Sequence, residues 1–111
     1  MANNLNKVIM QGNLTKDPEF KDVDGKRTCK LSIEAIRQYK DKKEACLVDA
    51  YCWDEFSEIA ERDLTKGSSI LLEGRLKQVT WLSENGENRH RHVIEITYFT
   101  ILPDDKDNHE I

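Results

Sequence analysis

The sequence predicts a small all-β domain, a five-stranded barrel that carries one helix. Short runs in which apolar and polar residues alternate are separated by turn-forming residues, the pattern of strands with one buried face. One interval has helical spacing instead, and an Asn-Gly pair joins the last two alternating runs as in a tight β-hairpin. At 111 residues the chain has the length of one domain.

The first three strands are expected at residues 5–11, 28–39 and 46–53. The first run ends at Gly12, shortly before the turn-prone Asp17-Pro18, and Asp24-Gly25 marks a tight turn before the second run. Small apolar side chains on one side of the third run suit a core. The opposite side carries Leu47, Asp49, Tyr51 and Trp53.

A helix is expected directly after the third strand. Asp54 is the expected N-cap, apolar residues recur at helical spacing from Phe56 to Leu64, and Lys66-Gly67 is the expected stop. Two further strands, at residues 69–81 and 89–102, flank the turn at residues 84–87. Three strands, a helix and two strands is the element order of the OB-fold, a partly open Greek-key barrel that binds oligonucleotides and oligosaccharides.

Charge is distributed unevenly along the chain. The net charge is −4, and residues 103–111 hold four acids against one lysine, so −3 lies there and −1 remains for residues 1–102. We expect an OB domain over residues 1–102 and a short, flexible acidic tail over residues 103–111. Because the body is nearly neutral, the local placement of charge matters more than the total.

Other compositional features exclude several classes of protein. Cys29, Cys46 and Cys52 are odd in number and form no Cys-x-x-Cys pair, so buried free thiols are expected rather than disulfides, and no metal or other cofactor is expected. The N-terminus lacks a basic start followed by an apolar stretch, and no apolar run is long enough for a membrane. A cytoplasmic protein without membrane contact is the expectation.

The last hairpin is the strongest candidate for a binding element. Arg75, Lys77 and Trp81 share one face by the two-residue period, and Arg89 and Arg91 lie on the facing strand. Cations for phosphates and rings on which bases stack are what sequence-independent binding of single strands uses. The alternatives are that Trp81 covers a core edge or pairs across strands, and that the Arg-His-Arg-His run is a solvated strand flank.

Two more rings are candidates, because Tyr39 and Trp53 are each expected on the outer face of their strand. The alternatives are that Trp53 plugs the bottom of the barrel and that Tyr39 is a surface ring. No catalytic motif competes with this interpretation: the sequence has no phosphate-binding glycine loop, no Gly-x-Ser-x-Gly and no His-Glu-x-x-His. An enzyme is not expected, and His109 is expected to face solvent.

Three segments resemble bacterial single-stranded DNA-binding proteins. Residues 6–19, NKVIMQGNLTKDPE, resemble the opening of that family; residues 56–68, and residues 72–76 leading to Trp81, are similar to later segments in the same order. The resemblance covers residues 5–102. It implies an OB-fold that protects single-stranded DNA without sequence preference in replication, recombination and repair, and a homo-oligomer, with a tetramer favoured over a dimer.

The resemblance also implies roles for particular residues. Tyr39, Trp53 and Trp81 fall where the family has aromatic residues, at the end of the second strand, before the helix and on the hairpin. Leu47 departs from the family at a position where many members stack a Trp. Asp49 replaces a basic or neutral residue and is expected to repel phosphate. Weaker binding, or a smaller site per subunit, is therefore expected.

The C-terminal segment departs further from the family, whose members continue into a flexible linker and an acidic tip that recruits replication and repair proteins. Here the segment is short. It is interpreted as a solubilising tail, with a reduced partner-recruiting tip as the alternative. Its acidic and apolar residues are Asp104, Asp105, Asp107, Glu110 and Ile111.

Taken together, the sequence predicts a sequence-tolerant protector of single-stranded DNA. The rings named above stack on bases, and cations contact phosphates. One alternative is an OB-fold protein-interaction subunit of a replication or recombination assembly, with weak or no DNA binding. An oligosaccharide binder is disfavoured by the hairpin cations. The predicted phosphate contacts are Lys7, Arg75, Lys77, Arg89 and Arg91.

Overall fold

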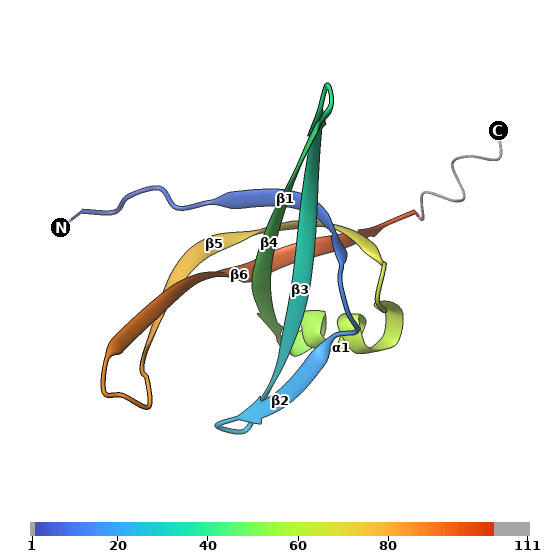
Figure 1. Cartoon of the computed structure of the whole chain (residues 1–111). Helices are drawn as coiled ribbons and strands as arrows, with labels where there is room; N and C mark the ends of the chain where they lie inside the picture. Colours follow the sequence, from blue (N-terminus) through green and yellow to red (C-terminus); the bar gives the residue numbers. More distant parts are fainter. Residues whose placement is uncertain (1, 104–111) are drawn as a thin grey trace.

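A computed structural model describes residues 2–103, which form six strands and one helix (Figure 1). The alternating runs of the sequence become strands because each can turn one row of side chains inward. The elements in chain order are β1 (Val8–Leu14), β2 (Glu19–Val23), β3 (Lys26–Tyr39), β4 (Lys42–Trp53), α1 (Asp54–Asp63), β5 (Ser69–Leu82) and β6 (Asn88–Leu102).

Five of the strands close into a barrel. The sheet runs in the order β1-β5-β6-β4-β3-β2, and β1 also pairs with β3 through Asn13↔Glu34 and Leu14↔Ile33, which closes the ring. β4 and β6 pair in parallel, whereas the other pairs are antiparallel. The predicted five-stranded OB-type barrel with a helix between its third and fourth strands is thereby confirmed.

The remaining strand, β2, was not predicted. It lies outside the closed ring and forms a hairpin with β3 through the turn at Asp24-Gly25, where both residues have positive φ. The tight turn itself was predicted. The strand was missed because only Phe20 in it is even partly buried, so it lacks the alternating pattern of a core strand.

The core lies inside the barrel and under α1. Cys29, Leu31 and Ile33 of β3 alternate with more exposed residues and have at most 1% of their surface exposed. Phe56 of the helix packs its ring against Phe99 of β6, with 5.3 Å between the ring centroids. The other buried apolar residues include Ala50, Cys52, Ile70, Leu72, Ile94 and Ile96.

Two hairpins extend beyond the barrel (Figure 1). All residues of β3 from Ile36 onward and all residues of β4 up to Leu47 are exposed, so this hairpin projects into solvent. The outer halves of β5 and β6 form a second arm that turns at Asn85-Gly86, as predicted. We call these the β3–β4 arm and the β5–β6 arm.

The ends of the helix differ from those predicted. Asp54 is not the N-cap: Trp53 occupies that position without a side-chain cap bond, and Asp54 begins the helix with a φ of 55°. A short polar residue tolerates this left-handed conformation, which turns the chain from strand into helix. Gly67 is not the stop either. The helix ends at Asp63, and the Gly67 N–H donates to the Leu14 carbonyl in the following loop.

The cysteines are free, and two of the three are buried as predicted. Cys29 and Cys52 face each other across β3 and β4 inside the core. A hydrogen bond with Cys29, together with burial, raises the pKa of Cys52, so this thiol stays protonated. For Cys46 the prediction of burial is wrong, because it lies on the exposed part of the β3–β4 arm. Within residues 2–103, no helix is long and apolar enough to cross a membrane.

Candidate nucleic-acid interface

One face of the β5–β6 arm combines an indole with cations. Residues directly opposite each other in an antiparallel pair share a face. In the β5–β6 register, Trp81 lies opposite Arg89. Lys77 lies opposite Val93, and Arg75 lies opposite Glu95. Trp81 is 44% exposed. The structure thus brings four of the five predicted cations and the predicted hairpin ring onto one surface, because Arg91 follows Arg89 two residues later.

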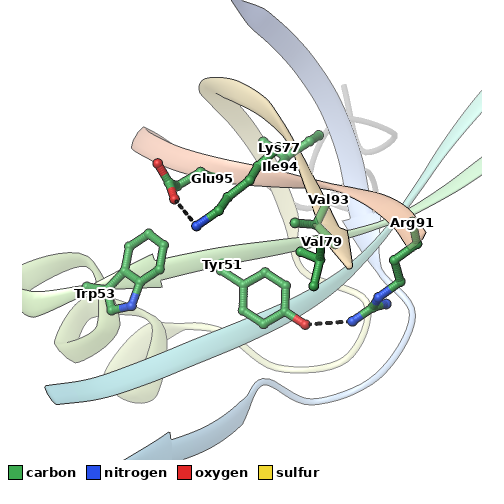
Figure 2. A pocket seen from close by; sticks show the side chains of 8 residues that line it. All are labelled: Tyr51, Trp53, Lys77, Val79, Arg91, Val93, Ile94 and Glu95. Atoms are coloured by element: carbon green, nitrogen blue, oxygen red, sulfur yellow. Dashed lines mark hydrogen bonds and ion pairs between the residues drawn. The ribbon is translucent and has the colours of Figure 1, made fainter. Parts of the chain in front are cut away.

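This surface continues onto the barrel through β4. Tyr51 pairs in register with Glu95 across the parallel β4–β6 pair, and Trp53 follows two residues later on the same side. Between β4 and the β5–β6 arm lies a hollow of about 210 Å³ (Figure 2). We call the hollow together with Arg75, Trp81 and Arg89 the binding face. The hollow is lined by Tyr51, Trp53, Lys77, Val79, Arg91, Val93, Ile94 and Glu95.

Polar contacts fix the positions of the cations around the rings of the hollow. The Arg91 guanidinium donates to the Tyr51 hydroxyl oxygen at 3.0 Å, so it lies at the rim beside the tyrosine ring (Figure 2). Trp53 lies at the opposite end and is partly exposed. Between them the hollow is lined by the apolar residues Val79, Val93 and Ile94, which suit the flat face of a base.

Every predicted phosphate-binding cation has a carboxylate within ion-pair distance. Glu95 faces both Arg75 and Lys77, and Asp49 pairs with Arg91. The two remaining pairs lie outside the hollow. The nitrogen–oxygen distances are 2.6 Å for Arg75–Glu95, 3.4 Å for Lys77–Glu95, 2.6 Å for Arg91–Asp49, 3.4 Å for Arg89–Glu87 and 3.8 Å for Lys7–Glu73.

Asp49 lies on the same side of β4 as Tyr51, but its charge is shared among several partners. It accepts from Arg91 at 2.6 Å and from the Ser32 hydroxyl at 3.2 Å, and Lys30 lies 3.8 Å away. Its hydrogen bond to Arg91 raises the pKa of that guanidinium. Asp49 therefore orients Arg91 in addition to carrying a negative charge near the site.

Tyr39 does not join the binding face. In the unshifted β3–β4 register it lies opposite Lys42 and shares a side with Ile33, whereas Trp53 lies on the other side. The expectation that Tyr39 lies on the outer face of its strand is wrong, because Tyr39 is an even number of residues from the core residue Ile33 and therefore lies on the same side of β3. Lys42, the residue opposite Tyr39, is 11 residues along β4 from Trp53. At about 3.3 Å per residue, this separates the two positions by about 36 Å. Tyr39 is 58% exposed near the tip of the β3–β4 arm.

Lys7 and Leu47 also lie apart from the hollow. Lys7 precedes β1 and pairs with Glu73, across the bulge of β5 from Arg75. Leu47 is 69% exposed on the β3–β4 arm, where it pairs in register with Glu34. If position 47 contacts a base, the contacting group is therefore an exposed leucine side chain and not a buried core residue.

Of the eight residues that line the hollow, five were not predicted as site residues: Tyr51, Val79, Val93, Ile94 and Glu95. Tyr51 had a signal, because it shares the two-residue period with Trp53, and Val79 lies between Lys77 and Trp81 by the same rule. Glu95 had none. Its place beside Arg75 depends on the β5–β6 register, which contains a bulge between Glu73 and Gly74.

Comparisons with known proteins agree with this geometry. The model of the Single-strand binding protein family matches residues 5–102. A single-stranded DNA-binding protein of Helicobacter pylori is 34% identical over 110 residues, 94% of this chain and 62% of the relative. One from Wolinella succinogenes is 38% identical over 95 residues, 80% of this chain and 59% of the relative. The chain thus spans about three fifths of the length of these relatives.

A solved structure gives the same fold. A Plasmodium falciparum SSB in complex with single-stranded DNA superimposes with a TM-score of 0.83 at 18% identity, over 93% of this chain and 99% of that one. At this identity the likeness concerns the fold. The family match over nearly the whole described chain and the resemblance of its opening residues lead to one conclusion: the chain belongs to the Single-strand binding protein family.

Proposed function

We propose that this protein binds and protects single-stranded DNA without sequence preference, through the binding face. The observation that carries the proposal is the common surface of Tyr51, Trp53 and Trp81 with a row of cations on β5 and β6. Rings accept any base by stacking, because every base has a π-face, and cations follow the phosphates. Membership of the family supports the same function, in replication, recombination and repair.

Stacking supplies the larger part of the binding in this proposal. Each base stacked on an aromatic ring contributes about 1–3 kcal/mol by alanine substitution. The cations contribute less than their number suggests, since each already faces a carboxylate. No bond is made or broken, so binding and release are the whole activity.

We further propose that the protein assembles with copies of itself. β1 pairs with β5 from Val8 to Asn13 but with β3 only at Asn13 and Leu14, so among the described residues one edge of β1 from Val8 to Gly12 has no strand partner. An open strand edge is a site for pairing with another chain. A second copy that pairs there gives a dimer, and two dimers give a tetramer; sedimentation measures which one forms.

We place DNA binding in residues 1–102. The acidic segment at residues 104–111, with its proposed role as a solubilising tail or a reduced partner-recruiting tip, lies outside the described residues, as does His109. Recruitment of replication or repair proteins by that segment is a proposal that a pull-down with the segment deleted addresses.

One observation favours a different function, a protein-interaction subunit. The carboxylates of Glu95, on the binding face, and Asp49, beside it, make the face less attractive to phosphate, and exposed rings are also hot spots for protein partners. Quenching of Trp fluorescence by an oligomer of dT separates the two, because Trp53 and Trp81 are the only tryptophans. Stacking predicts strong quenching that weakens with salt and falls in Trp81→Ala. Absent or salt-insensitive quenching contradicts the proposed function.

A further inference from the structure

Glu95 of β6 lies opposite Arg75 in the β5–β6 register and contacts both cations of the row on β5. Its Oε1 accepts from the Arg75 Nε at 2.6 Å, and its Oε2 accepts from the Lys77 Nζ at 3.4 Å (Figure 2 shows the latter bond). Among the described residues these two cations are its only side-chain partners. The Glu95 side chain is 20% exposed, whereas those of Arg75 and Lys77 are 56% and 51% exposed.

A carboxylate that bridges a guanidinium and an ammonium has the chemistry of a bound phosphate. Both groups are anions with several oxygens that accept charge-assisted hydrogen bonds, and both prefer the same donors. A DNA phosphate that approaches Arg75 or Lys77 therefore meets donors already in use and a negative charge beside them.

We infer that the Glu95 carboxylate competes with the phosphates of DNA for Arg75 and Lys77. By occupying this phosphate site, Glu95 limits the affinity of the binding face for DNA. The inference rests on the proposed function. Arg75, Lys77 and Glu95 together carry a charge of +1, so they act on phosphate as one cation. A strand must displace the Glu95 carboxylate to engage both, while stacking on the rings is unaffected.

Asp49 differs from Glu95 in this respect. Asp49 divides its charge between Arg91, Ser32 and Lys30, and so contributes to the structure of the β3–β4–β6 surface. Within residues 2–103, Glu95 makes side-chain bonds only to two exposed cations of one neighbouring strand. Removal of its charge therefore changes the phosphate site with little effect on the barrel.

The test is a salt titration of dT-oligomer binding by the full chain, with Glu95→Gln beside the wild type. Glutamine keeps the size of the side chain and an oxygen that can accept from Arg75. Removal of one negative charge about 4 Å from a phosphate is equivalent to about 1 kcal/mol in water, so we expect about fivefold tighter binding at low salt. One additional effective cation steepens the slope of log affinity against log salt by about 0.7 for a single strand.

Glu58→Gln is the matched control, because Glu58 is exposed on α1 and the substitution changes the net charge equally. It should leave the salt slope unchanged. Unfolding curves verify that each variant is folded, and Glu95→Ala serves as a second variant if the glutamine is unstable. Equal or weaker binding by folded Glu95→Gln, or a slope change matched by Glu58→Gln, overturns the role of Glu95. Lack of wild-type binding instead overturns the proposed function itself.

Discussion

Gly74→Ala should destabilise the protein strongly, because the backbones of β5 and β6 approach each other closely at this position. A Cβ on Gly74 would lie 2.2 Å from the Glu95 carbonyl oxygen and 3.1 Å from the Ile94 Cγ2. Contacts below 3.0 Å to backbone require the strands to move apart. Gly74 also follows the bulge of β5 and pairs with Val8 of β1, so the movement disturbs two ladders of the barrel.

The magnitude follows from these contacts. A shift of about 1 Å is needed to restore van der Waals distance, and overpacking of a well-packed site costs typically about 1–3 kcal/mol. A weakened ladder hydrogen bond adds about 1 kcal/mol. We expect a loss of about 2–4 kcal/mol in the free energy of unfolding. In a domain of this size each kcal/mol lowers Tm by about 4–8 °C.

Urea unfolding of Gly74→Ala and Gly86→Ala provides the assay. Gly86 has a φ of 80° and nothing within 4 Å of an added Cβ, so its substitution tests backbone conformation without crowding. That conformation costs an L-residue about 1–2 kcal/mol. A Gly74→Ala protein that loses no more stability than Gly86→Ala would show that the close approach of the strands is not a feature of the folded protein.

Three further predictions concern charge and thiols. Asp49→Arg should raise the affinity for dT oligomers in salt-titrated binding, since it removes an anion and frees Arg91; no gain would count against an unfavourable role for Asp49. The hydrogen bond from Arg75 lowers the pKa of Glu95 below 4.5, so its stabilising contribution is complete above pH 4.5 and is lost as the pH falls through the lowered pKa. The difference in unfolding free energy between wild type and Glu95→Gln should shrink in that acidic range, and a constant difference would contradict the ion pair. Iodoacetamide should label Cys46 in the folded protein and the other thiols only after unfolding; early labelling of more than one thiol per chain would contradict their burial.

Much of the fold could be predicted, because it depends on local patterns. The alternation around Ile33 and the Asn85-Gly86 turn are signals within a few residues, and they locate the barrel strands and the last hairpin. β2 could not be recognised, since its residues gain their structure by pairing with β3 and contribute only Phe20 to the core. The helix start was misjudged because Asp54 serves as a left-handed bend and not as a cap.

The candidate site was predictable only in part. The row of Arg75, Lys77 and Trp81 follows from the two-residue period alone. That period also places Tyr39 on the side of β3 that faces the core. This could not be recognised from the sequence, because the β3–β4 arm extends beyond the barrel and its residues from Ile36 onward are exposed on both sides. The partners of the cations could not be foreseen, because Glu95 meets Arg75 only through the register of two strands 20 residues apart.

A map of amide and indole NMR shifts during titration with a dT oligomer tests directly whether the binding face contacts DNA. We expect the largest changes at the indole N–H groups of Trp53 and Trp81 and at the backbone of Tyr51 and Arg91. Residues of β2 and the far side of α1 should stay unchanged. Changes that spare both indoles, or that concentrate on β2 or α1, would contradict the proposal that the binding face contacts DNA.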